Sequence, residues 1–274
     1  MQATSDNLIH FLGKQYKGSP NEQLGIFKSI INLGLGLSKT KIILGRGEGV
    51  DNHIVCFTDI PLSLCDEHTE KYGKFGIGFK KSSIKKCGGS PARYFINYLS
   101  METQDKSLID NRGSIYDNLC VHFEFVKKLK EALDNDHKFA LYDQNKKEIF
   151  SCTALKDWVD QQLTVLSFEK ETGDLGPVLD ETNGIDQFYK EREWRLVPLI
   201  GNLNSGSVIY DESKKSYYYK FKRKDINMVV TPNDEIRTEV VRFLLGLEKE
   251  ADDRLKEFAK NPLPIITYND LHKW

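Results

Sequence analysis

Apolar residues recur at three- and four-residue intervals early in the chain and predict a helix at residues 19–34. Ser19 stands at the expected N-cap, Pro20 at the first helical position, and Gly34 where a left-handed stop is needed. The apolar side chains of this segment share one face. We therefore expect an amphipathic helix that covers a core.

Alternating side chains follow this helix and predict strands. Two strands flank the glycine-rich loop in "KIILGRGEGVDNHIVCFTDIP", and Pro61 ends the second strand. A further short strand, "YGKFGIGFKK", carries Gly76 and Gly78 two residues apart. At these glycines we expect a bend or a close approach between backbones.

Helical spacing returns in the middle of the chain. "SPARYFINYLS" predicts a helix that begins at Ser90 and Pro91. "HFEFVKKLKEALDNDHKF" and "SCTALKDWVDQQLTVLSFEKE" also have apolar residues at three- and four-residue intervals, and Ser151 can cap the second. The block at about 100–175 is therefore predicted to be helical.

Strand patterns resume in "EREWRLVPLI" and in "SGSVIYDESKKSYYYKFKRKDINMVVTP". The last amphipathic segment, "DEIRTEVVRFLLGLEKEADDRLKEFAK", predicts one long C-terminal helix introduced by Pro232 and Asn233. This order of elements predicts a single α+β domain at 1–274 with a mainly helical insertion at about 100–175. Two separate lobes are the alternative.

Composition narrows the class of protein but not its partners. The 274 residues are 39% hydrophobic, which is enough for a sizeable core, and the 39 basic and 40 acidic residues nearly cancel. The five cysteines are odd in number and lack a C-x-x-C pair, which is typical of a reducing compartment. The sequence shows no secretory leader and no long apolar run. We expect a soluble cytoplasmic protein with no membrane partner.

Two common nucleotide-binding motifs and a common metal motif are missing. "GLGLSKT" has Ser38 before Lys39, where a P-loop requires glycine, and "GRGEG" lacks the third glycine of a dinucleotide fingerprint. The histidines show no H-E-x-x-H pattern and no pair four residues apart. The sequence therefore predicts no metal site.

Charged residues cluster at the start of one late strand. Glu191, Glu193 and Arg195 project to the same side, because strand side chains alternate with a period of two. One interpretation is a pair of catalytic carboxylates. The other is a surface ladder in which Arg195 pairs with Glu193. His10, in the apolar "LIHF", is either a site residue or a histidine satisfied by a backbone carbonyl.

Aromatic and basic residues alternate in "YYYKFKRKD" at 217–225. Tyr218, Lys220, Lys222 and Arg223 have the composition of a surface that stacks bases beside phosphates. "KKSSIKK" at 80–86 adds further basic residues. The alternative is an ordinary amphipathic strand with packed tyrosines and solvated lysines.

Several of these segments together resemble the AbiGi-type abortive-infection proteins of bacterial phage defence. They include "LIHF", "INLGLGLS", "VCFTDIPL", "EHTEKYGKFGIGFKK", "GGSPARYF" and "EREWRLV", which cover roughly residues 8–98 and 186–200. An early histidine, a middle strand with aromatic and hydroxyl side chains, and a late glutamate are also similar to the ADP-ribosyltransferase fold. The resemblance implies an ADP-ribosyltransferase-like core with a mixed or antiparallel sheet.

The same resemblance implies a chemistry and roles for particular residues. NAD would be the co-substrate, and loss of nicotinamide would build an oxocarbenium-like cation of the kind that carboxylates stabilise. Glu193 would stabilise that cation, and Glu191 would orient or deprotonate the acceptor. The residues implied to bind the cofactor are His10, Phe57, Thr58 and Arg195.

Two functions from different classes follow. The first is an anti-phage toxin, an NAD-dependent mono-ADP-ribosyltransferase that modifies a macromolecular acceptor and that a cognate antitoxin neutralises. Nucleic acid is the favoured acceptor, with RNA slightly ahead of DNA. The alternative is a non-catalytic, antitoxin-like interaction protein whose C-terminal helix could dock a partner. Expression alone separates them, since a toxin should halt growth through Glu193 and an antitoxin should be harmless.

Overall fold

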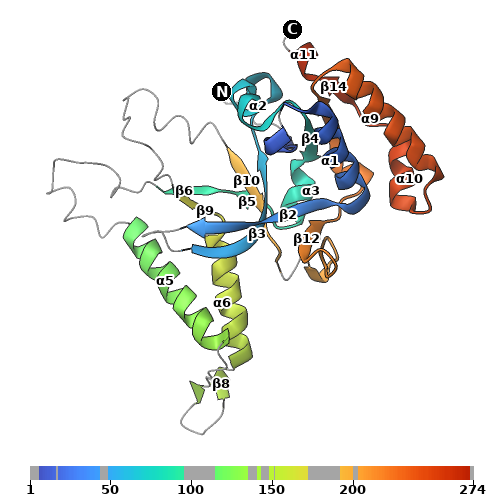
Figure 1. Cartoon of the computed structure of the whole chain (residues 1–274). Coiled ribbons are helices and arrows are strands. Elements are labelled where there is room, and N and C mark those ends of the chain that lie inside the picture. The colour runs from blue at the N-terminus through green and yellow to red at the C-terminus, as the bar shows by residue number, and fades with distance from the viewer. Residues whose placement is uncertain are drawn as a thin grey trace, which may run out of the picture. The chain divides into compact units, whose positions relative to one another are not determined.

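The computed structural model describes residues 6–16, 18–43, 49–95, 115–134, 141–142, 148–150, 152–171, 192–199 and 203–271 (Figure 1). The chain divides into two units. The first combines Met1–Ser38, His53–Pro91 and Tyr189–Trp274, and the second combines Lys39–Asn52 and Ala92–Phe188. The insertion predicted at about 100–175 falls within the second unit.

A ten-stranded mixed sheet organises the fold, in the order β11-β12-β2-β3-β1-β4-β13-β14, with β10 paired to β3 and β5. β1 pairs antiparallel with β3 and β4, whereas β13 and β14 run parallel. The strands are β1 Asn7–Phe11, β2 Leu35–Ile43, β3 Gly49–Thr58, β4 Gly76–Lys80, β5 Ser90–Pro91, β10 Glu193–Leu196, β11 Val208–Asp211, β12 Ser216–Tyr219, β13 Ile226–Thr231 and β14 Ile265–Thr267. The expected α+β class with an open mixed sheet is confirmed.

Helix α1 spans Pro20–Leu33 and ends at Gly34, as its sequence predicts. Gly34 has a φ of 103°, and a Cβ there would lie 2.7 Å from the Tyr219 carbonyl oxygen. Glycine is therefore required both by the backbone conformation and by the close approach of β12. Ser19 makes no side-chain capping bond, and its carbonyl instead accepts from the Glu22 amide at 3.1 Å.

Strand β4 lies between β1 and β13, where its two glycines allow neighbours to approach closely. A Cβ on Gly76 would meet Ile9 Cγ2 at 3.0 Å, and a Cβ on Gly78 would meet Met228 Cγ at 2.7 Å. The close approach at these glycines is thus one of neighbouring side chains rather than the predicted approach between backbones.

Aromatic side chains link the sheet to its covering helices in the first unit. Phe27 of α1 stacks on Phe75 at 5.4 Å between ring centroids, and Phe221 contacts Phe79 of β4 at 5.2 Å and Phe258 at 6.4 Å. These five rings are fully buried. The other helices of this unit are α2 Asp66–Tyr72, α3 Lys81–Lys86, α9 Asp234–Gly246, α10 Asp253–Lys260 and α11 Tyr268–Leu271.

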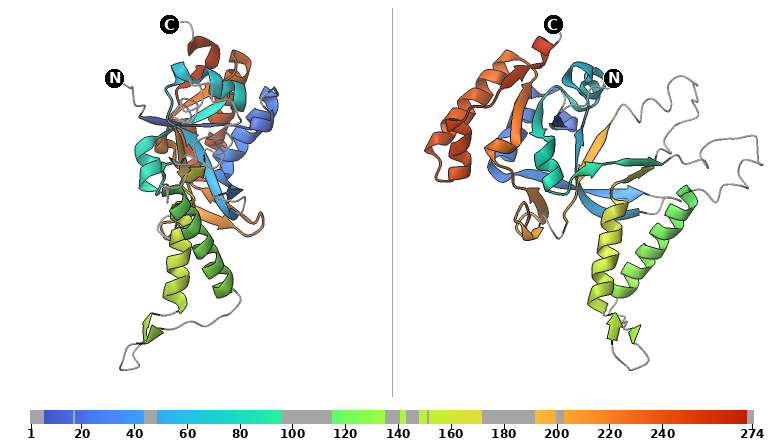
Figure 2. Two further views of the ribbon diagram at one scale, coloured as in Figure 1. Left: turned by 90° about the vertical axis from the view of Figure 1, so that its left-hand side faces the viewer. Right: turned by 180° about the vertical axis from the view of Figure 1, so that it is seen from behind.

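Two long helices dominate the second unit, as predicted. α5 spans Ile115–Asp134 and α6 spans Cys152–Leu166. They lie side by side in all views (Figures 1 and 2) and pack through buried residues that include Val126 and Val159. The short strands of this unit are β6 Arg93–Phe95 with β9 Glu169–Glu171, and β7 Leu141–Tyr142 with β8 Glu148–Phe150. Ser151, the expected cap of α6, lies outside the described residues.

The helix predicted to begin at Ser90 and Pro91 is wrong. Ser90 and Pro91 form β5, which pairs with Arg195 and Trp194 of β10, and the chain continues into β6. The serine and proline signal is real for a helix start, but pairing with a distant strand overrides it.

The single long C-terminal helix is also wrong. Asn233 caps α9 by accepting from the Ile236 amide at 2.9 Å, but α9 ends at Gly246. A short 3-10 turn follows, and Asp252 then starts α10 by accepting from the Arg254 amide at 2.8 Å. The second cap gives the chain a new helix start within an unbroken apolar pattern. None of the helices in the described ranges is both long and apolar enough to cross a membrane.

Candidate functional site

A small pocket of about 250 Å³ opens in the first unit where β1, β3, β10 and α2 meet. Its residues come from segments far apart in sequence, because β3 pairs with both β1 and β10. The lining residues are Ile9, His10, Phe11, Cys56, Phe57, Thr58, His68, Tyr72 and Glu193. The sheet pairing thus brings an early histidine and a late glutamate to one place.

His10 is held in one orientation by the neighbouring strand. Its Nδ1 donates to the Cys56 carbonyl at 2.8 Å, and its ring meets Phe57 edge to face at 5.9 Å. Because a carbonyl oxygen only accepts, the neutral ring carries its proton on Nδ1 and has an acceptor at Nε2. Burial lowers the pKa of His10, against the smaller raising effect of the carbonyl bond. The imidazole is therefore a neutral acceptor at neutral pH.

The Glu193 carboxylate forms an ion pair with Arg195 of the same strand. Its Oε1 accepts from Arg195 Nε at 2.7 Å and from the Cys56 thiol at 3.2 Å. The side chains of Glu193 and Arg195 are only 13% and 10% exposed. The ion pair between Arg195 and Glu193 that the sequence suggested is thus present, but its side chains are nearly buried instead of exposed on the surface. A carboxylate bound in this way is well suited to accept hydrogen bonds from a ligand.

The middle strand supplies the wall of the pocket. Phe57 is 2% exposed and packs on Phe79 as well as on His10, so its ring belongs mainly to the core. Thr58 is 4% exposed and pairs with both Ile9 and Glu193 across the sheet. The two residues line the pocket with little side-chain area exposed to solvent.

The structure therefore brings four of the predicted site residues to one pocket: His10, Phe57, Thr58 and Glu193. Arg195 acts on this pocket through Glu193 rather than by lining it. Glu191 lies outside the described residues. Their assigned roles toward NAD stay predictions, as do NAD as co-substrate and enzymatic activity.

Five lining residues were not predicted as site residues, and three of them, Cys56, His68 and Tyr72, carry polar groups. Cys56 is exposed and stands two residues before Thr58, so strand alternation could have found it. His68 and Tyr72 stand four residues apart on α2, with ring centroids 5.5 Å from each other. Nothing in the local sequence links α2 to β1, since only the tertiary fold brings them together.

The predicted nucleic-acid-binding residues have different environments. Lys220 donates to the Leu33 carbonyl at the end of α1, and burial lowers its pKa. The Arg223 guanidinium also binds backbone carbonyls. Tyr218 is half-buried, with Lys214 Nζ 5.5 Å from its ring centroid. Of the four, Lys222 alone has a side chain that is exposed to solvent.

A second feature of functional interest is the two-faced hairpin of α5 and α6 in the second unit. Val121 and Phe125 of α5 are 67% and 57% exposed, and Trp158 and Val165 of α6 are 37% and 46% exposed. An α-helix turns by about 100° per residue. Around the axis of its own helix, each of these four side chains lies roughly 100–150° from the buried residues, and the direction of rotation is the same in α5 and α6. Figures 1 and 2 show that the two helices form an antiparallel hairpin. The helical period therefore places the four side chains on one face.

The opposite side of this hairpin is charged. Lys127 pairs with Glu131 at 3.9 Å within α5, and Lys130 pairs with Asp160 across the two helices at 2.8 Å. The helical period puts Lys127, Glu131 and Asp160 roughly 100–140° from the buried rows in the other sense. One side of the hairpin is thus polar and ion-paired, and the other is apolar and open to solvent. We call the latter the Phe125 face.

One comparison with known proteins gives a match. The family model described as "Putative abortive phage resistance protein AbiGi, antitoxin" matches residues 37–232, more than two thirds of the chain. The matched range includes β3, both helices of the hairpin and β10. Neither a curated protein nor a solved structure matches the chain.

This match corrects the first function drawn from sequence. The prediction of a toxin that transfers ADP-ribose to a nucleic acid is wrong, because the family is described as an antitoxin. The spacing of Glu191 and Glu193 determines only that their side chains point to the same side of a strand. It does not reveal that Arg195 already compensates the Glu193 charge. An antitoxin family suggests a partner toxin in place of the expected cognate antitoxin.

Proposed function

The chain belongs to the AbiGi family of abortive phage resistance proteins, and we propose that it acts as a non-catalytic antitoxin that binds a partner toxin. The observation that carries this proposal is the Phe125 face, an exposed apolar surface on a packed helical hairpin. The toxin would dock on this face with an apolar surface of its own.

The composition of the face supports a protein partner. Protein interfaces have aromatic and apolar centres from which charged residues are depleted, and aromatic side chains dominate their binding energy. Phe125 and Trp158 supply such aromatic area, with Val121 and Val165 beside them. Buried contacts between α5 and α6 hold these side chains on rigid helices, so little ordering entropy opposes binding.

Growth assays test the function directly. Expression of the chain alone should leave growth unchanged, and its co-expression with candidate toxin genes from the same locus should restore growth that the toxin stops. Growth arrest by the chain alone would contradict the proposal, most clearly if Glu193→Gln relieved it.

Substitutions on the hairpin test the docking face. Phe125→Glu and Val165→Glu should weaken toxin binding by about 2 kcal/mol or more each, roughly a 30-fold change. Both side chains are exposed, so the melting temperature should stay nearly unchanged. Thr153→Glu, which adds the same charge at an exposed position on the polar side of α6, is the matched control. Rescue by Phe125→Glu and Val165→Glu variants at the natural level would disprove this docking face.

We also propose that the sheet core has an ADP-ribosyltransferase-like fold and that it does not catalyse ADP-ribose transfer. Its support is the meeting of His10, Thr58 and Glu193, from three strands, in one pocket. Such a pocket could bind NAD without consuming it. Titration with NAD should then raise the melting temperature by mass action, and no rise at millimolar NAD would contradict this form.

A further inference from the structure

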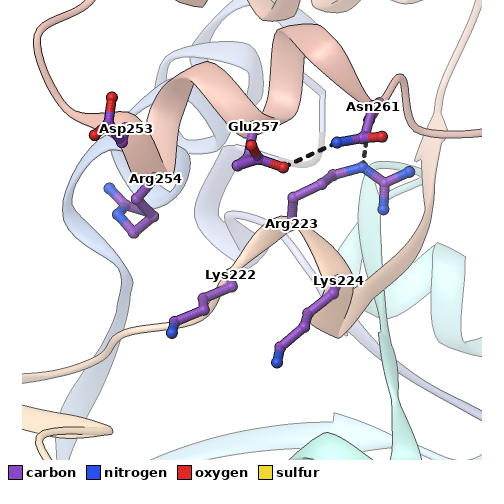
Figure 3. Close-up of a pocket in the computed structure, with 7 residues that line it drawn as sticks. All are labelled: Lys222, Arg223, Lys224, Asp253, Arg254, Glu257 and Asn261. Atoms are coloured by element: carbon purple, nitrogen blue, oxygen red, sulfur yellow. Dashed lines mark hydrogen bonds between the residues drawn. The ribbon is translucent and has the colours of Figure 1, made fainter.

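A second hollow in the first unit has a volume of about 760 Å³, and the described residues that line it are polar or charged. It lies between the segment Lys222–Lys224 and helix α10 (Figure 3). Its lining residues are Lys222, Arg223, Lys224, Asp253, Arg254, Glu257 and Asn261. We call it the Lys222 hollow.

Two arginines give this hollow fixed positive charge. Arg223 donates to the carbonyls of Asn261, Ile226 and Pro262, the last at 2.8 Å. Arg254 donates to the carbonyls of Ile31 and Asn32 at the end of α1, at 2.9 and 2.6 Å. Carbonyl oxygens are neutral, so these bonds hold the guanidinium groups in place without cancelling their charge. Burial lowers the pKa of Arg223.

The acidic residues of the hollow do not cancel this charge. Asp253 pairs with Lys256 at 3.0 Å, and Glu257 accepts from the Asn261 amide at 2.9 Å. Asp252, outside the lining, forms an ion pair with Arg254 Nε at 3.6 Å and offsets part of the charge of this one arginine. Four cations therefore face two carboxylates in the lining, and one of these carboxylates already has its own lysine.

Lys222 and Lys224 are the cations that remain available. Both are exposed, and neither ammonium group has an ion-pair partner among the described residues. Figure 3 shows their side chains extending in the same direction, while Arg223 between them turns toward Asn261. Two exposed lysines thus flank an arginine that backbone carbonyls hold in place. This arrangement suits an extended anion.

We infer that the Lys222 hollow binds the phosphate backbone of a nucleic acid. Protein–nucleic acid interfaces are polar and positively charged, whereas the centre of a protein interface is apolar and depleted of lysine. Within the part of the chain that the structure describes, the hollow has no aliphatic or aromatic lining residue, unlike the Phe125 face, so an acidic protein segment fits it less well. The charged lining residues would contact phosphates, and phosphate contacts carry no sequence information, so binding should be independent of base sequence. This inference does not rest on the proposed toxin docking.

Fluorescence anisotropy with a labelled 16-nucleotide oligouridine RNA tests the inference on the whole chain. Binding should weaken linearly on a logarithmic salt scale between 50 and 200 mM KCl. Lys222→Gln with Lys224→Gln should weaken binding by about tenfold or more at 50 mM, and lower the salt slope by about 1.4, at roughly 0.7 per phosphate contact. Lys14→Gln with Lys74→Gln removes the same charge at exposed positions elsewhere in the unit and should leave both values unchanged.

Three outcomes would overturn the inference. One is no RNA binding by the natural chain at 50 mM KCl. Another is equal binding by the double variant and its control. The third is equal or tighter binding of a 16-residue polyglutamate peptide that the double variant loses, which would assign the hollow to an acidic protein. Toxin rescue by the double variant is measured in parallel, so that failure here is distinguished from failure of the docking proposal.

Discussion

The Arg195 guanidinium donates to the Glu193 carboxylate at 2.7 Å, two residues away on the same side of β10, with both side chains nearly buried. A desolvated pair of this kind is costly to break from one side, because the remaining charge stays in a poorly hydrated place. The pair therefore connects the stability of the sheet to the chemistry of the pocket.

The first prediction concerns this pair. Arg195→Met should lower the free energy of unfolding by about 3 kcal/mol, because it leaves the Glu193 carboxylate without its counterion. Glu193→Gln combined with Arg195→Met should cost less than the two single changes added together. Urea unfolding of the four proteins measures this coupling. Additive losses, each below about 1 kcal/mol, would mean that the pair behaves like an exposed one.

The second prediction follows from the lowered pKa of His10. As pH falls below about 6.5, the unfolded chain gains a proton on this residue that the folded protein resists. Stability linked to His10 is therefore present above that pH and is lost as the pH falls toward the lower folded pKa. His10→Gln can still donate to the Cys56 carbonyl but does not titrate. Its melting temperature should fall less than that of the natural chain between pH 7.5 and 5.5, and an equal fall would contradict the prediction.

The third prediction compares Gly25, inside α1, with Gly34 at the C-terminal end of α1. Gly34→Ala should lower the free energy of unfolding by about 1–3 kcal/mol, because its φ is positive and its Cβ would meet the Tyr219 carbonyl. Gly25→Ala should instead raise it by about 1 kcal/mol, since Gly25 lies inside α1 with open space around its Cβ position. Thermal and urea unfolding measure both. A loss at Gly25 similar to that at Gly34 would contradict this account.

Much of the secondary structure could be predicted because its signals are local. Pro20 and Gly34 mark the bounds of α1, and Asn233 marks the start of α9 through its own capping bond. Glu193 and Arg195 could be assigned to one side of a strand from their spacing alone. Ser90 and Pro91 failed as a helix start because strand β10, more than a hundred residues later, pairs with them.

The candidate site was only partly predictable for the same reason. His10 and Glu193 could be singled out as residue types, but Cys56 and the α2 residues His68 and Tyr72 join them only through packing. The basic stretch at 217–225 was visible in sequence, yet its cations have different roles. In the folded protein Lys220 and Arg223 donate to backbone carbonyls, whereas Lys222 stays exposed.

By itself the sequence determined the α+β class, the amphipathic helices of the insertion and the family resemblance, because these depend on the order and periodicity of residues along the chain. Tertiary structure decided which charges are compensated and which apolar faces stay open. Charge pairing and burial depend on neighbours that are distant in sequence, as Arg195 beside Glu193 and the solvent-exposed Phe125 demonstrate. Spacing alone places Glu193 and Arg195 on one side of a strand, whereas their burial as an ion pair depends on the elements packed around them.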